Sequence, residues 1–289
     1  MPRGALCISI DVELAWGIWD KPSPDYHARC AAHESEIIRG LVERFDRFEV
    51  SATWAIVGRL LERDPVAARS TLHGERIWYA PTLIDVVRSA RTPQDIGSHS
   101  YAHVYFGATS REAIREDLAA ARRVHDAYGL PFVSFVFPRN QVAHLELLRE
   151  AGVRVFRSVD HGWHIAVRER FGAPAGRVAN LADKVLPIPP AVVQPIDHHG
   201  LVELPSSMLL LARKGLRRAV HPAAVIAKAR LGLAAARRTG GTFHLWFHPS
   251  NFYYDTERQL DTLGAILAAA AELRDRGELD IRPMSSYAA

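Results

Sequence analysis

Cysteine is nearly absent from this sequence, with only Cys7 and Cys30 among 289 residues. Two cysteines cannot build the disulfide framework of a small secreted domain, and their scarcity fits a reducing compartment. No uninterrupted apolar run is long enough to cross a bilayer. The short apolar run at the amino terminus ends at Asp11 and lacks the longer apolar core of a signal peptide. We therefore expect a cytoplasmic protein, unless processing has removed an export signal.

Acidic residues are absent between Leu204 and Tyr254, although the whole chain carries 36 Lys and Arg against 32 Asp and Glu. The cations of this segment are Arg213, Lys214, Arg217, Arg218, Lys228, Arg230, Arg237 and Arg238. A local field of one sign affects binding more than the net charge does. We expect residues 208–238 to contact an anionic membrane surface or an anionic substrate carrier, with 208–219 and 223–238 as basic helices. The alternative is a solvated helix face.

Aromatic side chains are missing from residues 208–240. Recognition of a nucleic acid needs aromatic or base-edge contacts interleaved with the cations. The basic segment therefore does not predict a nucleic-acid-binding protein.

The rest of the composition is that of an ordinary globular protein, with 48% hydrophobic and 24% charged residues. Apolar or β-branched runs predict strands at 5–10, 50–57, 132–137, 153–156, 201–204, 242–247 and 279–281, and a short strand before His99. Periodic patterns predict helices at 34–48, 111–128, 144–151 and 256–276. This alternation favours a parallel (β/α) barrel, closed or partly closed, over a doubly wound open sheet. No repeat or long linker interrupts the chain, so we expect one domain over residues 1–289.

Chemically competent side chains fall at or just after the ends of these predicted strands. They are Asp11, Glu13, His99, Arg139 and His248. Asp11 and Glu13 point the same way, because residues two apart share a face of a strand. Parallel barrels place their active sites at the carboxyl ends of the strands.

His99 and His103 are spaced so that one helical turn or a tight loop brings both imidazoles to one point. Two imidazoles suit a borderline-soft divalent metal such as zinc, and a catalytic zinc takes a third protein ligand. The segment Asp11-Val12-Glu13 offers that ligand. The alternative is that the two histidines are unrelated polar side chains.

The motifs of this chain resemble those of the NodB-type polysaccharide deacetylases, carbohydrate esterase family four. The matching segments, in the family's order, are Ser9–Glu13, Ala52–Trp54, Ile96–His103, Phe137–Gln141 and His244–Pro249. The resemblance covers nearly the whole chain. It implies a distorted (β/α) barrel, a metal site of two histidines and a carboxylate, and removal of N- or O-acetyl groups from sugars.

Two departures from the family pattern stand out. The commonest members carry adjacent aspartates where this chain has Asp11 and Glu13, spaced by one residue. The arginine motif usually continues with prolines and an aromatic, whereas Arg139 is followed by Asn140 and Gln141. The second departure changes the pocket wall, so it concerns the substrate class more than the type of reaction.

The resemblance implies roles for individual residues. Glu13, His99 and His103 would hold one divalent metal, zinc or else cobalt or another first-row metal. Asp11 would act as general base, with the exchange of its role with Glu13 as the alternative, and Arg139 would orient Asp11.

A second group of residues would handle the leaving group and the substrate. His248 would protonate the leaving amine, its alternative being a buried structural histidine. The backbone N–H of Asn140 or Gln141 would stabilise the oxyanion. Trp16 and Trp246 would contact a sugar ring.

The leading hypothesis is a metal-dependent hydrolase that removes an N-acetyl group from an amino sugar, a precursor in cell-surface glycan biosynthesis. The departure after Arg139 leaves open a metal-dependent amidohydrolase that acts on a non-sugar amide, formamide or cyclic amide. A third hypothesis, a carbohydrate-binding relic without activity, conflicts with the complete set of polar site residues.

Overall fold

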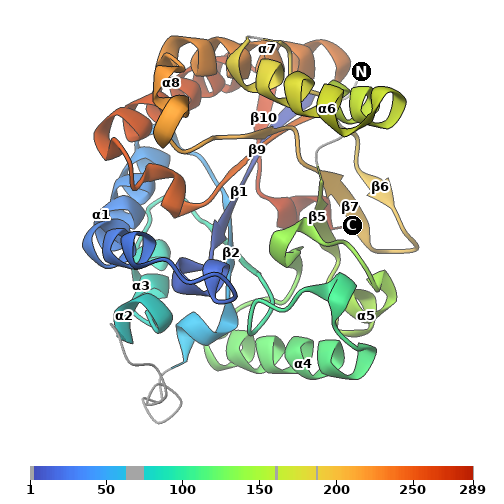
Figure 1. Ribbon diagram of the computed structural model, residues 1–289. Helices are drawn as coiled ribbons and strands as arrows, with labels where there is room; N and C mark the ends of the chain where they lie inside the picture. The colour runs from blue at the N-terminus through green and yellow to red at the C-terminus, as the bar shows by residue number, and fades with distance from the viewer. Residues whose placement is uncertain (1–2, 63–74, 160–161, 187, 289) are drawn as a thin grey trace.

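The computed structural model describes residues 3–62, 75–159, 162–186 and 188–288. Helices surround a curled, mostly parallel sheet (Figure 1). The sheet has ten strands in the described part of the chain, in the order β6-β7-β5-β4-β3-β2-β1-β9-β8, with β10 paired to β1. β6 and β8 remain edges, so the barrel is open. This confirms the predicted distorted (β/α) barrel.

The strands are β1 (Gly4–Val12), β2 (Thr53–Ile56), β3 (Asp95–Ser98), β4 (Ser134–Val136), β5 (Val155–Ser158), β6 (Ile196–Asp197), β7 (Val202–Pro205), β8 (Met208–Leu209), β9 (Thr242–Phe247) and β10 (Leu279–Ile281). The α-helices are α1 (Pro24–Phe48), α2 (Glu75–Trp78), α3 (Leu83–Arg88), α4 (Arg111–Ala127), α5 (Leu145–Glu150), α6 (Trp163–Val185), α7 (Pro222–Thr239) and α8 (Thr256–Asp275). The 3-10 helices that bear on the site are η1 (Leu14–Ile18), η5 (Pro138–Asn140), η6 (Gly215–Ala219) and η7 (Pro249–Phe252). Within the described ranges, no helix has both the length and the apolar character needed to cross a bilayer.

β1 lies at the centre of the sheet, and all nine of its residues are buried. It pairs with β9 on one edge, and on the other with β10 near its start and with β2 near its end. A strand covered on both faces reads as a continuous apolar run, which is why the sequence pattern revealed it. The strand continues to Val12, so Glu13 stands directly at its carboxyl end.

The outer helices cover the sheet in two apolar clusters. α1, α7 and α8 pack on β1 and β9 in the larger cluster, while α4 and α5 pack on β4 and β5 in the smaller one. α1 begins ten residues earlier than predicted, because Ser23 caps it by accepting the N–H of Tyr26 and Pro24 occupies its first turn.

The prediction of a basic helix at 208–219 is wrong. This stretch forms the two-residue strand β8, an extended loop and the 3-10 helix η6. Gly215 has φ +58°, a left-handed conformation that ends any continuous helix here. The second basic stretch, 223–238, does lie in a helix, α7.

Candidate active site

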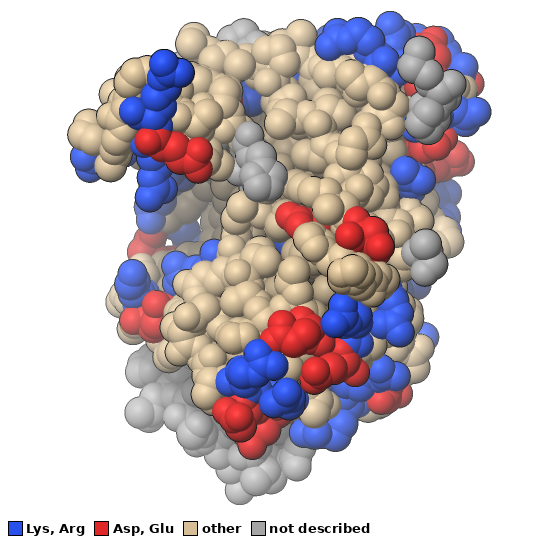
Figure 2. Space-filling view, turned by 90° about the vertical axis from the view of Figure 1, so that its right-hand side faces the viewer, with Lys and Arg blue, Asp and Glu red and all other residues tan. Residues whose placement is uncertain are grey.

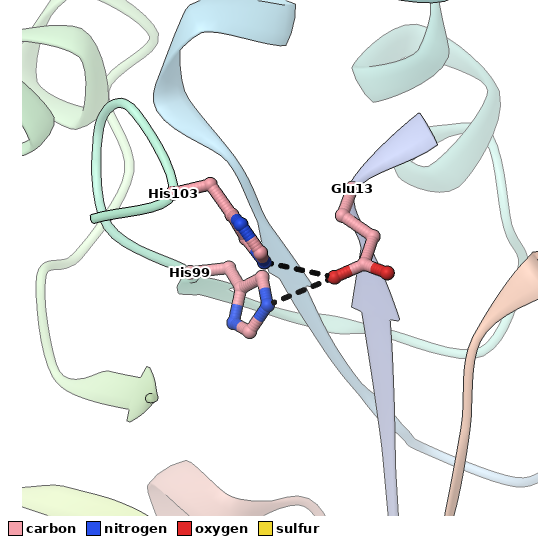
Figure 3. Close-up of side chains that lie close together, drawn as sticks. All are labelled: Glu13, His99 and His103. Atoms are coloured by element: carbon pink, nitrogen blue, oxygen red, sulfur yellow. Dashed lines mark hydrogen bonds and ion pairs between the residues drawn. The ribbon is translucent and has the colours of Figure 1, made fainter. Parts of the chain in front are cut away.

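Two histidines and a glutamate meet at the carboxyl ends of β1 and β3 (Figure 3). The Nε2 atoms of His103 and His99 lie 3.0 Å and 3.4 Å from Oε2 of Glu13. One ligand atom from each residue lies within 4.8 Å of the others, and both imidazoles are buried. Glu13, and not Asp11, is the carboxylate that faces the two imidazoles.

The loop that carries the histidines is held by Asp117, a buried residue of α4. Its two carboxylate oxygens accept the backbone N–H groups of Tyr101 and Ala102, each at 2.8 Å. Ser100 and His103 adopt positive φ values of 63° and 54°, which make the loop tight enough to bring the imidazoles together. Burial raises the pKa of Asp117, whereas these N–H donors lower it. Sequence reasoning missed this residue.

The donor set fits a divalent metal such as zinc. Nδ1 of His99 donates to the carbonyl oxygen of Val136 at 2.9 Å, which leaves the lone pair on Nε2. That Nε2 atom is buried and has no hydrogen-bond partner among the residues that the structure describes. Burial lowers the pKa of His103 and so favours its neutral form. Burial opposes ionisation of Glu13, but His248, His103 and His99 outweigh it and hold the pKa well below its usual range.

Arg157 on β5 forms a bidentate ion pair with Asp11. Nη1 lies 2.6 Å from Oδ1 and Nη2 lies 2.7 Å from Oδ2, with both side chains buried. Burial raises the pKa of Asp11, but Arg157 and then His248 counteract it, and the net pKa falls below its usual value. Asp11 is therefore a carboxylate at neutral pH.

The prediction that Arg139 orients Asp11 is wrong. Arg139 follows β4 in η5 with a φ of 55°, and its Nη2 donates to the carbonyl oxygen of Gly17 and to Asp20 at 3.0 and 2.9 Å. It thus secures the loop after β1, while Arg157 reaches Asp11 from within the sheet. The sequence carried one signal for this, a lone charged residue between Phe156 and Ser158 at the end of a predicted strand.

Further contacts hold Arg157 in place. Its Nη1 donates to Oγ of Ser9 at 3.0 Å and its Nη2 to Oδ1 of Asn140 at 3.0 Å. Its guanidinium lies 4.2 Å from the ring centroid of Trp246. The indole predicted to contact the sugar therefore packs on the arginine instead.

Three further assignments from the sequence are not supported. Trp16 is buried in the core, where its indole N–H donates to the carbonyl oxygen of Trp78 at 2.9 Å. The N–H groups of Asn140 and Gln141 already donate to carbonyl oxygens within the turn at η5, so neither is free for an oxyanion. The side chain of Gln141 packs toward Gly107 and does not line the pocket.

The proposed chemical groups share one pocket of about 580 Å³. Asp11, Glu13, His99, Arg139, Asn140 and His248 all line it, and so does Arg217 from η6. Nε2 of His248 lies 3.6 Å from Oδ2 of Asp11 and 3.5 Å from Oε1 of Glu13. Asn251 holds the backbone of His248, whose N–H donates to Oδ1 of Asn251 at 2.8 Å.

Comparison by sequence finds no matching family model and no matching curated protein. Comparison by structure finds a protein from Mycobacterium smegmatis classed as a polysaccharide deacetylase, 19% identical, with a TM-score of 0.68 over 100% of this chain and 90% of that one. A protein from Pseudomonas aeruginosa PAO1 classed in the same way is 11% identical, with a TM-score of 0.62 over 98% and 89% of the two chains. An allantoinase is also 11% identical, with a TM-score of 0.62 over 98% and 88%. The chain therefore has the NodB-type polysaccharide-deacetylase fold that its motifs predicted.

Proposed function

We propose that this chain is a divalent-metal-dependent hydrolase that removes an N-acetyl or related N-acyl group from an amino sugar, as a step toward a cell-surface glycan. One observation carries the proposal. A buried ionised carboxylate, Asp11, and an imidazole, His248, line a pocket together with Glu13 and His99, two of the three residues that could hold a metal ion. Amide hydrolysis needs a base for the attacking water and an acid for the leaving amine, and these groups provide both.

Glu13, His99 and His103 would hold the cation. We expect zinc, with cobalt or another first-row metal as the alternative. A cation bound there would supply Lewis acidity, which favours ionisation of water and polarises an acyl carbonyl.

Asp11 would accept the proton of the attacking water, since its carboxylate is ionised and lines the pocket. His248 would donate a proton to the leaving nitrogen as the C–N bond breaks. The 3.6 Å between Nε2 of His248 and Oδ2 of Asp11 would let the proton held by Asp11 return to the imidazole for the next cycle. Arg157 would keep Asp11 in its orientation throughout.

The proposal is tested by metal analysis and by acetate release from a panel of N-acetylated sugars. Asp11→Asn should retain one metal per chain and lose about 10²–10⁴-fold in kcat, because a base contributes on that order. Glu13→Gln should lose the metal. Asp11→Asn should lose stability, because the buried guanidinium of Arg157 loses its counter-charge, but it should still fold, because the amide oxygen still accepts from Arg157. If Asp11→Asn lost the metal and Glu13→Gln kept it, the two roles would be exchanged.

The panel also includes formamides and cyclic amides. An allantoinase shares the fold, so the fold alone does not separate sugar amides from these substrates. Turnover of a cyclic amide without turnover of any acetylated sugar would favour the second class of substrate.

The side-chain amide of Asn140 is our candidate for the group that donates a hydrogen bond to the oxyanion of the reacting acyl group. Its Oδ1 accepts from Arg157 at 3.0 Å, and a guanidinium has donors only, so this contact orients the amide with Nδ2 directed away from Arg157. Because Asn140 lines the pocket, Nδ2 would donate to the carbonyl oxygen as negative charge develops on it.

Asn140→Ala should lower kcat by about 10²–10³-fold with little change in KM, as expected when a donor acts mainly in the transition state. Gln141→Ala is the matched control, because this neighbour does not line the pocket, and it should change kcat little. A nearly unchanged kcat for Asn140→Ala would assign the oxyanion to another donor.

A further inference from the structure

The loop between β8 and α7 is held in a defined shape by Arg213. This side chain is buried, and its Nη1 and Nη2 donate to the carbonyl oxygens of Val220 and Arg218 at 2.7 and 3.0 Å. Its Nε donates to Asp255 at 3.0 Å, and Nε of Arg218 donates back to the carbonyl oxygen of Arg213 at 3.2 Å. These contacts hold both ends of the loop in place, so the conformation of its central residues is defined. We call this segment between β8 and α7 the braced loop.

The braced loop directs Arg217 toward the catalytic pocket, which it lines. Within the described ranges, no carboxylate lies at ion-pair distance from Arg217. The neighbouring cations make other contacts. Lys214 lies 3.8 Å from Asp25, and Arg218 donates to the carbonyl oxygen of Arg213 within the loop. Across the pocket, Arg139 is neutralised by Asp20. Arg217 thus lines the pocket without an ion pair to any carboxylate in the part of the chain that the structure describes.

The other end of the basic segment faces away from the site. α7 runs back along the barrel, so its last turn lies beside the start of β1, where a Cβ on Gly4 would lie 2.1 Å from the carbonyl oxygen of Ala236. Arg237 there pairs with Glu278. The carboxyl end of the basic segment therefore lies away from the site, although it precedes the strand that leads to His248, because a helix that precedes a parallel strand ends at the strand's amino end.

Charge is mixed on the face of the molecule that Figure 2 shows. On the face of Figure 2, Lys and Arg side chains are interspersed with Asp and Glu, and no broad patch of one sign covers it. On this face, recognition of an anion is therefore expected at a particular side chain rather than over a broad patch.

We propose that Arg217 binds a phosphate group that links the amino sugar to its carrier, an inference that rests on the proposed function. Asp11 is paired with Arg157 and Arg139 with Asp20, whereas Arg217 lines the same pocket without an ion pair to any carboxylate of the described residues, so it is the guanidinium that we expect to receive an anionic group. A guanidinium matches the oxygens of a phosphate with two parallel donors.

The carrier phosphate has two sources, a nucleotide or a lipid. Leu216, next to Arg217, has 95% of its surface exposed at the tip of the braced loop. An apolar side chain beside a phosphate-binding arginine would contact the chain of a lipid carrier, whereas a nucleotide carrier would leave it in water.

The first experiment compares KM for N-acetylglucosamine and for its 1-phosphate or uridine diphosphate derivative. Arg217→Gln should raise the ratio of the phosphorylated KM to the neutral KM by about 10-fold or more, since hydrogen bonds to charged groups contribute about 1.5–3 kcal/mol. The substitution should raise KM and leave kcat nearly unchanged, because the phosphate contact would stabilise the bound substrate and the transition state equally. Arg237→Gln, at the far end of α7, is the matched control and should leave the ratio unchanged.

The second experiment measures equilibrium binding of inorganic pyrophosphate to the purified protein and to Arg217→Gln. Binding should weaken about 10-fold in the variant, and in the wild type it should weaken with added salt. Because this readout needs no turnover, it holds even if no acetylated sugar proves to be a substrate. Equal pyrophosphate affinities in the two proteins, or an unchanged KM ratio alongside normal acetate release, would overturn the assignment of Arg217 while the deacetylase proposal stands.

The third experiment separates the two carriers. Leu216→Ser should slow turnover of an N-acetyl sugar on a lipid phosphate in vesicles if the carrier is a lipid, and should leave the nucleotide sugar unaffected. Equal turnover of the lipid substrate by both proteins would assign the phosphate to a nucleotide.

Discussion

Replacing His99 by Ala is expected to abolish both the proposed binding of a divalent metal and the proposed hydrolase activity. Loss of a contact that only supports a metal ligand already costs about 10–100-fold in affinity, so loss of a ligand should cost more. Nε2 of His99 is buried, has no hydrogen-bond partner among the described residues and lies 3.4 Å from Oε2 of Glu13, so the variant removes an atom that is free to bind the cation. His103→Ala should give the same result.

Elemental analysis after dialysis against a weak chelator, together with acetate release, measures both effects. His33→Ala is the matched control, because this histidine lies at the surface, 3.8 Å from Glu36, and should keep full metal content. One metal per chain retained in both His99→Ala and His103→Ala would rule out this site as the metal centre.

Replacing Arg157 by Met is expected to cause the largest loss of stability of any single change discussed for this site. It would leave the Asp11 carboxylate buried and unpaired, and breaking a buried ion pair in this way costs about 3–5 kcal/mol of unfolding free energy. Activity should fall with it, because Asp11 would lose its orientation. Denaturant unfolding followed by circular dichroism measures the first effect.

The double variant Asp11→Asn, Arg157→Met separates the cost of an unpaired buried charge from the cost of lost side-chain packing. Without either charge the penalty of an unpaired group disappears, so the double variant should be more stable than Arg157→Met and remain inactive. Arg157→Lys should fall between the wild type and Arg157→Met, since lysine keeps the charge but not the two parallel donors. If Arg157→Met were as stable as the wild type, the ion pair would not hold this part of the sheet together.

Local sequence patterns were sufficient for the barrel. The strands of this sheet are covered on both sides, so they appear as short apolar runs, and the residues at their carboxyl ends can be read directly from the chain. Asp11, Glu13, His99 and His248 were found in this way, and all four line one pocket. The clustering of Glu13 with two imidazoles follows from the tight loop after β3.

Only the tertiary structure decided which side chains hold these residues in place through ion pairs and hydrogen bonds. Arg139 and Arg157 both lie near strand ends. Because β4, β3 and β2 lie between β5 and β1 in the sheet, it is the curling of the sheet that brings Arg157, and not Arg139, to Asp11. Asp117 supports the histidine loop from the next α-helix, 16 residues beyond Tyr101, and no local sequence pattern marks that contact. The basic segment, continuous in sequence, is divided by the antiparallel course of α7, so that Arg217 reaches the pocket and Arg237 does not. Composition and spacing describe neighbours along the chain, whereas the partner of a buried charge is set by which strands and helices pack together.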